Sequence, residues 1–154
     1  MLRMPPQLPF NGDWGSYIQE VYDFLINDVL LSGLRFRGLP VRLRNDPEYQ
    51  GKEFGFWHLT SEGNTEEDRT PDLERCKRIP WIAHMISHNT HQDVSCWPER
   101  RGATEEWVIW NEVEDYVVVL SARRDYWLLK TAYLVTYNSK RRSLRQSRQR
   151  ALGT

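Results

Sequence analysis

The chain has 154 residues, and its 21 Lys and Arg residues balance its 21 Asp and Glu residues. A hydrophobic content of 40% and an aromatic content of 12% exclude an intrinsically disordered chain. This length is typical of a single domain with one hydrophobic core. The longest apolar run is far shorter than the roughly 20 residues of a membrane-spanning helix, which excludes that class as well.

The net charge of zero is the sum of two segments of opposite charge. Residues 138–154 contain no acidic residue and six basic residues: Lys140, Arg141, Arg142, Arg145, Arg148 and Arg150. The remaining 137 residues hold 15 basic and 21 acidic side chains, a net charge of −6. We therefore predict one domain over residues 1–137 and a basic C-terminal arm over residues 138–154. The arm either binds an acidic partner such as nucleic acid or folds back on its own acidic surface.

The cysteines and the first residues indicate the compartment. Cys76 and Cys96 are the only two cysteines, which implies no disulfide framework, so we expect free thiols in a cytoplasmic protein. Pro5, Pro6 and Pro9 interrupt the beginning of the chain. We therefore also expect no signal peptide.

Residues 1–12 are expected to form an irregular, Pro-rich lead to the first predicted helix. Asp13 is a suitable N-cap, and Gly33 is a natural stop. Between them, apolar residues recur at near-helical spacing: Tyr17, Val21, Phe24, Leu25, Val29 and Leu31. We predict a helix that begins after Asp13 and ends before Gly33.

Two strands are predicted next. Residues 39–44 alternate between apolar and polar side chains, and a polar turn at residues 45–47 follows. Residues 54–60 also have the pattern of a strand, with one face made of Phe54, Phe56, His58 and Thr60 and the other of Gly55, Trp57 and Leu59. This assignment places His58 on a sheet.

A broken helix and an irregular stretch follow these strands. Residues 61–70 form a polar, acidic loop, and Thr70 followed by Pro71 is a typical helix start. Pro80 removes a backbone donor and must therefore break or kink this helix. Residues 87–105 contain turn-forming residues without periodicity, and no element is predicted there.

The last third of the sequence predicts an antiparallel meander. Strands are expected at residues 107–110, 116–120 and 126–137, with a turn at residues 122–125. The basic arm has the composition of a solvated helix or an extended tail. The elements together predict an α+β fold: an N-terminal helix and a four- to five-stranded, mainly antiparallel sheet with helices packed on one face.

Familiar catalytic signatures are absent, among them the Gly-rich phosphate loop, G-x-S-x-G and H-E-x-x-H. His58 is the first candidate for chemistry, because a histidine has an ordinary pKa suited to general acid–base catalysis. Its aromatic neighbours are consistent with an apolar-walled cleft. The alternative is a core or edge histidine held by one hydrogen bond, and a single residue does not distinguish the two.

Two groups of side chains are suited to phosphate binding. Thr131 and Tyr133 share one face of the last predicted strand, beside Lys130, and hydroxyl groups can donate to a phosphate. Arg75 and Arg78 lie three apart on the second predicted helix, and Arg forks bind phosphate through paired hydrogen bonds. Ordinary strand propensity and a solvated helix face account for the same residues without a ligand.

A histidine cluster offers a metal-binding alternative. His84 and His88 are four residues apart and share a helix face, with His91 shortly after them. No C-x-x-C pair accompanies them, and the spacing from Cys76 to Cys96 matches no standard zinc site. The competing interpretation is that His88 and His91 are solvated beyond a frayed helix end.

Three segments, taken together, resemble a nuclease superfamily. They are residues 51–60 (GKEFGFWHLT), residues 69–81 (RTPDLERCKRIPW) and residues 128–133 (LLKTAY). The combination resembles the phage- and mobile-element-borne nucleases of the barnase–EndoU–colicin E5/D–RelE superfamily. The likeness spans most of residues 38–137. It implies that the strand histidine, the following basic residues and the late Thr-Ala-Tyr line one concave sheet face.

The resemblance implies metal-independent RNA cleavage without a cofactor, often by a toxin that attacks tRNA or mRNA. It assigns His58 as acid or base, Arg75 or Arg78 as transition-state stabiliser, and Thr131 and Tyr133 as ligands of the scissile phosphate. Tyr133 is also a second proton carrier in this assignment. The remaining substrate contacts are expected from Trp57, Thr60, Lys130, Arg141 and Arg142. A neutralising antitoxin or immunity protein is an expected partner.

Two other functions stay open from the sequence. A protein of this fold can act as a non-catalytic RNA-binding or protein-interaction module, and the histidine cluster can bind a metal. The nuclease interpretation has a geometric requirement. We expect His58, Thr131 and Tyr133 to line one cleft, because a shared scissile phosphate must contact all three.

Overall fold

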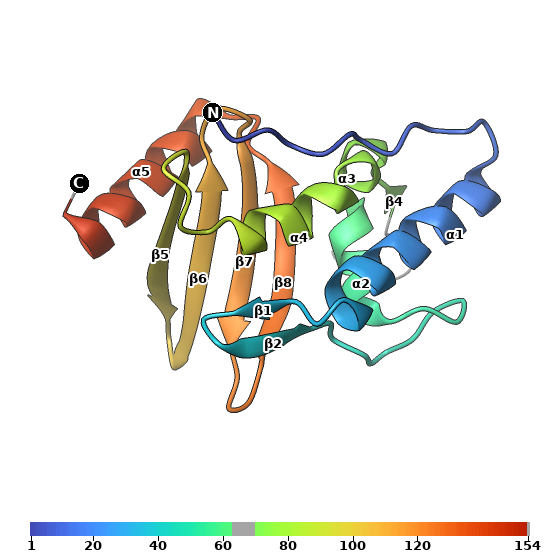
Figure 1. Cartoon of the computed structure of the whole chain (residues 1–154), viewed down its shortest axis with the longest axis horizontal. Coiled ribbons are helices and arrows are strands. Elements are labelled where there is room, and N and C mark those ends of the chain that lie inside the picture. Colours follow the sequence, from blue (N-terminus) through green and yellow to red (C-terminus); the bar gives the residue numbers. More distant parts are fainter. Residues whose placement is uncertain (63–69, 154) are drawn as a thin grey trace.

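A six-stranded sheet forms the centre of the computed structural model, which describes residues 1–62 and 70–153 (Figure 1). The strands lie in the order β1-β2-β8-β7-β6-β5; β2 is parallel to β8, and the other neighbours are antiparallel. The strand bounds are β1 (Arg35–Phe36), β2 (Leu39–Arg42), β5 (Val94–Arg101), β6 (Thr104–Asn111), β7 (Tyr116–Ala122) and β8 (Trp127–Leu134). The predicted α+β class with a mainly antiparallel sheet is confirmed, with six strands in place of four or five.

Six helical segments and a small strand pair complete the described part of the chain. They are α1 (Trp14–Leu25), a π-helical segment η1 (Ile26–Leu31), α2 (Phe54–Thr60), β3 (Ser61–Glu62), β4 (Thr70–Pro71), α3 (Leu73–Lys77), α4 (Ile79–Ser87) and α5 (Asn138–Leu152). The Asp13 carboxylate accepts a hydrogen bond from the Ser16 N–H at 3.3 Å, so the predicted first helix and its cap are confirmed. Among the described residues, no helix combines the length and apolar content needed to cross a bilayer.

The central strands form a hydrophobic core on each face of the sheet. Ile109 and Val118 belong to the larger core, together with buried residues of α1 and α4. Their sequence neighbours Val108 and Val117 pack on the opposite face with Leu144 of α5. Figure 1 shows α4 crossing in front of β7 and β8 on the first of these faces. Because α5 covers part of the second face, the predicted arrangement with helices on one face only is wrong.

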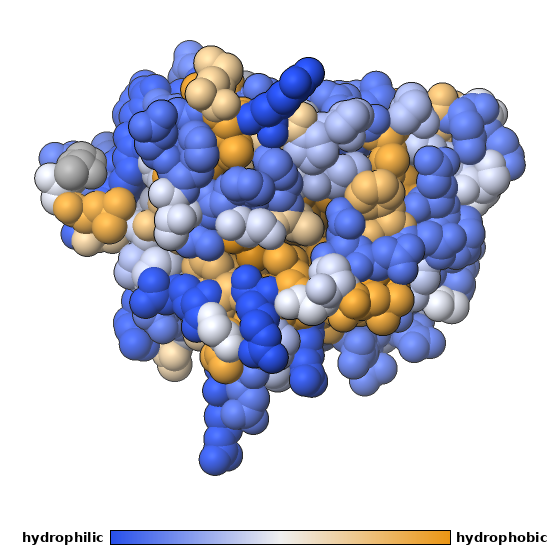
Figure 2. Space-filling model, viewed as in Figure 1, coloured by the Kyte–Doolittle hydropathy of each residue, from blue (hydrophilic) through white to orange (hydrophobic). Residues whose placement is uncertain are grey.

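Aromatic packing holds the β1–β2 hairpin on the larger core. The ring of Phe36 meets those of Trp107 and Trp127 edge-on, at centroid distances of 5.9 and 5.1 Å. The guanidinium of Arg37, in the turn, lies 4.3 Å from the Trp107 ring centroid. Figure 2 shows apolar surface between α4 and this hairpin, with hydrophilic side chains around it. This packing brings β2 beside β8 and so positions the chain that follows β2.

Residues 54–60 form the helix α2, and the predicted strand is wrong. The buried side chains follow a single helix face: Gly55, Phe56, Leu59 and Thr60. The aromatic content of the segment favoured a strand, because such residues are common in sheets, but strand preference depends strongly on tertiary context. The correction moves His58 from a sheet to a helix, one turn after Phe54.

Residues 94–101 form the edge strand β5, although no element was predicted there. Each residue of β5 has a partner in β6. Pro98 and the charged residues 99–101 interrupt the apolar alternation that would mark a strand, while Val94 and Trp97 are buried. Proline and charged side chains are typical of edge strands, because they discourage pairing with other chains.

The second predicted helix starts later than expected and is divided at the predicted proline. Asp72, and not Thr70, is the N-cap, and its carboxylate accepts from the Arg75 N–H at 3.2 Å. Thr70 instead belongs to β4. The first helix α3 ends at Lys77, and α4 has Pro80 in its first turn, where the missing N–H costs little. The break near Pro80 is therefore confirmed.

The basic arm forms α5 and packs against the acidic body. Arg145 and Arg148 both bind the carboxylate of Glu112, at 3.0 and 3.2 Å, and Arg141 pairs with Asp115. Partly exposed ion pairs contribute modestly, and the buried apolar side of α5 adds to them. Of the two arrangements expected for the arm, the structure has the one that folds back.

We predict that docking of α5 weakens in acid. Burial raises the pKa of Glu112, but hydrogen bonds from Arg145 and Arg148 outweigh burial and lower this pKa below its ordinary value. A lowered carboxyl pKa stabilises the fold fully above the ordinary value of about 4.3, and this contribution is lost as pH falls through the folded-state value. Glu112→Gln should therefore reduce stability at neutral pH by up to about 1 kcal/mol and make the acid loss smaller.

The measurement is the denaturation midpoint as a function of pH for the wild type and the variant. Glu114→Gln is the matched control, since Glu114 is exposed and forms no ion pair within the described residues. Equal acid sensitivity of the wild type and Glu112→Gln would contradict the assignment.

Candidate functional site

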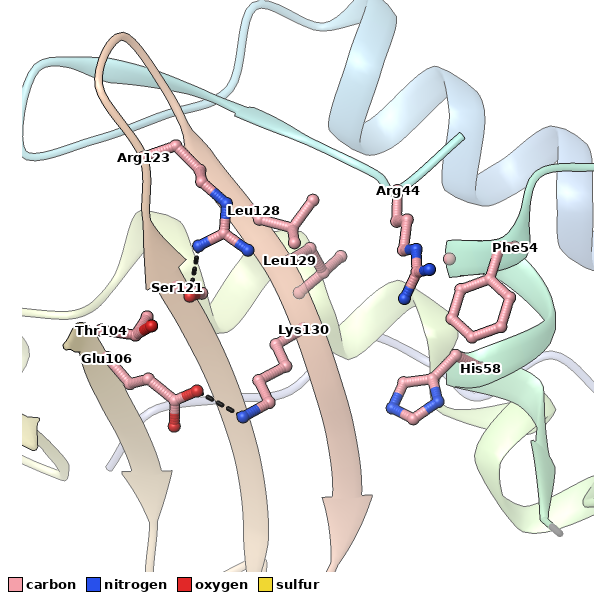
Figure 3. Close-up of a pocket in the computed structure, with 11 residues that line it drawn as sticks. Arg44, Phe54, His58, Thr104, Glu106, Ser121, Arg123, Leu128, Leu129 and Lys130 are labelled. Carbon is pink, nitrogen blue, oxygen red and sulfur yellow. Dashed lines mark hydrogen bonds and ion pairs between the residues drawn. The ribbon is translucent and has the colours of Figure 1, made fainter. Parts of the chain in front are cut away.

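A pocket of about 320 Å³ opens between α2 and the sheet (Figure 3). Residues of β6, β7 and β8 line it on the face that carries the smaller core. Its principal polar and charged lining residues are Arg44, His58, Glu106, Ser121, Arg123 and Lys130. The fold thus gathers one histidine, one carboxylate and three cations from segments that are far apart in the sequence.

A buried carboxylate lies in this pocket. Glu106 is 4% exposed, and an isolated buried carboxylate is strongly unfavourable. Its Oε2 pairs with the Lys130 Nζ, and its Oε1 lies 3.4 Å from the Arg101 Nε. Because pairing offsets the cost of removing a charge from water, the burial of Glu106 depends on these two cations.

Lys130 reaches this carboxylate from a β-bulge in β8. Leu129 lies opposite Leu120 and Thr131 lies opposite Val119, so Lys130 is the extra residue between two paired positions. Neighbouring residues of a regular strand point to opposite faces, but a bulge allows Lys130 and Thr131 to share one face. The Lys130 side chain is 46% exposed, so it is in part open to solvent although its amine pairs with a buried carboxylate.

The opposite wall is formed by α2 and the chain that follows β2. The ring of His58 stacks on that of Phe54, with centroids 5.9 Å apart and an interplanar angle of 14°. The guanidinium of Arg44 lies 4.4 Å from the centroid of the same Phe54 ring. Figure 3 shows Arg44 and His58 pointing from this wall into the space beside Lys130.

A close backbone contact joins α2 to the segment that carries Arg44. The Gly55 N–H donates to the Arg44 carbonyl at 2.9 Å, and the Phe54 N–H donates to the Asn45 carbonyl at 3.3 Å. A Cβ atom at Gly55 would lie 2.9 Å from the Arg44 backbone nitrogen, which is too close for a side chain. The relative placement of Arg44 and His58 therefore depends on this glycine.

Arg123 adds a third cation to the pocket. Its Nη1 donates to the Ser121 Oγ at 2.7 Å and to the Ala122 carbonyl at 3.0 Å. Together with Arg44 and Lys130 it gives the lining more positive than negative charge. A concave site with this excess attracts anions, and guanidinium groups are well suited to phosphate.

Of the predicted site residues, His58 and Lys130 line this pocket. Thr131 and Tyr133 lie further along the same face of β8, outside the lining, and the Lys140 amine lies 5.6 Å from the Tyr133 ring centroid. The cleft expected to hold His58, Thr131 and Tyr133 thus contains His58 alone of the three.

Trp57 and Thr60 take part in the packing of α2. The Trp57 Nε1–H donates to the Tyr49 carbonyl at 2.8 Å, and the buried Thr60 hydroxyl donates to the Phe56 carbonyl at 2.9 Å. Neither residue lines the pocket, although both were predicted to bind substrate. Their place on a helix, and not on a strand, accounts for the difference.

Arg75 and Arg78 lie beside the larger core. The Arg78 Nη1 donates to the Glu74 carboxylate at 3.0 Å, and the Arg78 carbonyl accepts from the Tyr116 hydroxyl at 3.4 Å. Arg75 pairs with its own helix cap, Asp72, at 3.7 Å. Neither arginine lines the pocket, so the structure does not place them with His58. Arg69, the first residue of the same motif, is outside the described residues.

The two predicted arm residues lie on α5. The Arg141 guanidinium binds Asp115 and donates to the Asn138 side-chain carbonyl at 2.6 Å. Arg142 is exposed and, within the part of the chain that the structure describes, takes part in no ion pair. Neither lines the pocket, because α5 lies on another part of the same face.

The histidine cluster does not assemble into a metal centre. The rings of His84 and His88 lie 4.2 Å apart, and burial together with His88 lowers the pKa of His84. The His91 Nδ1 instead accepts from the Asp93 N–H at 3.0 Å. Across residues 1–62 and 70–153, no three His, Cys, Asp or Glu side chains are grouped as a metal site.

Three charged lining residues were not among the predicted site residues: Arg44, Glu106 and Arg123. Arg44 directly precedes one predicted turn and Arg123 lies within another, and charged residues are common at turns and carry little signal. Glu106 directly precedes the predicted strand at residues 107–110, and a charged residue at that position is typical of an exposed strand end. Its period-two relation to Val108 was the available signal, since it places Glu106 on a buried face.

We predict that Gly55→Ala displaces α2. The added methyl group must push the Arg44 backbone away, and overpacking of this kind typically costs about 1–3 kcal/mol. We expect a lower thermal midpoint and altered pocket geometry. Gly15→Ala is the matched control, because Gly15 is an exposed position of α1 where the added methyl group would meet no atom within 4 Å and alanine is the better helix former. Unchanged stability of Gly55→Ala would contradict the close contact.

Comparisons of the chain with protein-family models, with curated proteins and with solved structures find no match.

Proposed function

We propose that the protein is a metal-independent endoribonuclease whose active site is the pocket between α2 and the sheet. One observation carries the proposal. His58 and Arg44 from the α2 side line the same pocket as Arg123 and the Glu106–Lys130 ion pair from the sheet side. Two acid–base groups, here an imidazole and a carboxylate, and several cations are the parts that phosphodiester cleavage without a metal requires.

The chemistry assigns one role to each group. A base removes the proton of the ribose 2′-OH, and the 2′-oxygen then forms a bond to phosphorus while the bond to the 5′-oxygen breaks. An acid supplies a proton to the departing 5′-oxygen. We assign the first transfer to Glu106 and the second to His58, because they are the carboxylate and the imidazole of the lining. The products are a 2′,3′-cyclic phosphate and a free 5′-hydroxyl.

The cations serve the phosphate. Charge accumulates on the non-bridging oxygens in the transition state, and fixed donors aimed at it lower the barrier. Lys130 has a partly exposed side chain, and Arg44 and Arg123 present planar guanidinium groups. Thr131, Tyr133, Arg75 and Arg78 have no part in this proposal, because none of them lines the pocket.

The resemblance in residues 51–60, 69–81 and 128–133 supports a toxin-type enzyme. Such an enzyme acts on tRNA or mRNA in the cytoplasm and is held in check by an antitoxin or immunity protein. These are parts of the same proposal, and the pocket chemistry does not depend on them.

A non-catalytic RNA-binding module is the second candidate function. Both carboxylate oxygens of Glu106 already have cationic partners, Lys130 and Arg101. A carboxylate fixed in this way can orient Lys130 for phosphate binding without accepting a proton. The two functions differ in whether RNA is cut.

The test is incubation of tRNA and mRNA pools with the protein in EDTA. We expect cleavage that survives EDTA and leaves 2′,3′-cyclic phosphate ends. His58→Ala and Glu106→Gln should each reduce the rate by roughly 10²–10⁴, the usual contribution of a positioned acid or base. His91→Ala is the matched control, since His91 lies outside the pocket.

Each other outcome supports a different function. Salt-sensitive RNA binding without cleavage favours the binding module. RNA cleavage that EDTA abolishes favours a metal-dependent activity, with His84, His88 and His91 as the candidate ligands. Intact RNA and no binding by the folded protein contradict both candidates.

A further inference from the structure

A chain of alternating charges leads from α5 across the sheet to the pocket. Arg101 Nη2 lies 3.0 Å from Glu99 Oε1, and Arg101 Nε lies 3.4 Å from Glu106 Oε1. The other oxygen of Glu106 pairs with Lys130. The signs therefore alternate along the series Glu99, Arg101, Glu106 and Lys130, and each inner member contacts a neighbour on either side.

The strand register explains why Arg101 is needed. Glu99 of β5 lies directly opposite Glu106 of β6. Like charges at directly opposite positions of an antiparallel pair repel each other and destabilise the sheet. Arg101 contacts both carboxylates through different nitrogens, so it turns a repulsive pair into a bridged one. Without it, Glu106 would keep Lys130 as a cation but face Glu99 across the strands.

At the other end of this series of charges, Glu99 is held by groups of the smaller core. The Ser147 Oγ of α5 donates to Glu99 Oε2 at 2.8 Å and accepts from the Trp97 Nε1–H at 2.8 Å. Trp97 is fully buried, and Ser147 is nearly so. Each oxygen of Glu99 therefore has one partner, and its position is set by α5 on one side and by Arg101 on the other.

We propose that Arg101 is a positioning residue for the pocket and that α5 fixes this position through Ser147. Arg101 does not line the pocket and its side chain is 59% exposed. It acts by holding the Glu106 carboxylate where this group orients the Lys130 amine. The kinetic part of this inference rests on the proposed nuclease function, whereas the coupling between Arg101 and Lys130 does not.

The first experiment compares Arg101→Met, Arg101→Lys and the control Arg100→Met. Arg100 is exposed and adjacent to Arg101 on β5, but it points to the opposite face. We expect Arg101→Met to lower kcat about tenfold or more with little change in KM, because misplacement of an active-site group affects the chemical step. Arg101→Lys should restore most of the loss, and Arg100→Met should match the wild type. Equal kcat values for Arg101→Met and Arg100→Met overturn the proposal.

The second experiment requires no activity. Denaturation midpoints are measured for Arg101→Met, Lys130→Met and the double variant. The two side chains share Glu106 as a partner, so we expect their effects to be non-additive, whereas Arg100→Met and Lys130→Met should be additive. An additive result for Arg101 and Lys130 overturns the proposal whatever the kinetics. A wild type that cleaves no RNA but shows the coupling contradicts the proposed function alone.

Ser147→Ala tests the contact between α5 and Glu99, at the opposite end of the charge series from Lys130. It remains informative if Arg101→Met does not fold. It removes the hydroxyl between Trp97 and Glu99. We expect a fall in kcat in the same direction as for Arg101→Met. Ser143→Ala, at an exposed position of the same helix, should have no effect. Equal kcat values for the two serine variants overturn the assigned role of α5.

Discussion

The burial of the Glu106 carboxylate is the constraint to which the rest of the candidate site is tied. A charge removed from water must be matched by opposite charge and by hydrogen bonds. Lys130 and Arg101 supply that match from strands on different sides of Glu106. The need of Glu106 for two cations therefore links the edge strand β5, which carries Arg101, to β8, which carries Lys130. It also keeps the positive charge of Lys130 in the pocket. An apolar residue in place of Glu106 would leave these two cations without their common partner.

The two-sided sheet explains how an acidic body carries a basic C-terminal segment. The apolar residues of β6 and β7 alternate between two cores, so each face needs a cover. The larger core is covered by α1 and α4, and α5 covers part of the smaller one. Ion pairs with Glu112 and Asp115 use part of the arm's positive charge. The two segments of opposite net charge thus pack against each other within the same molecule.

Local signals in the sequence predicted the first helix, the break near Pro80 and the strands of the last third, because caps, proline and alternation act over a few residues. They failed at α2 and β5. In α2, seven aromatic-rich residues fit a strand or a helix equally, and tertiary packing decides between them: Phe56 and Leu59 enter the larger core, and Gly55 contacts the Arg44 backbone. Of the candidate site, His58 and Lys130 were found. Glu106 was missed because its role arises from Arg101 and Lys130, distant partners that no local pattern reveals.

The bulge at Lys130 places a lysine in the pocket but interrupts the hydrogen-bonded ladder between β7 and β8. A regular β8 would keep an unbroken ladder with β7, and the amine at this position would have no assured place on the pocket's face. Natural strands carry such irregularities where a side chain must be aimed, and they accept a weaker ladder in return. Shortening β8 by one residue at this point would be expected to tighten the sheet while emptying the pocket of its lysine. Selection for a sturdier fold and selection for the site would then act in opposite directions on a single residue.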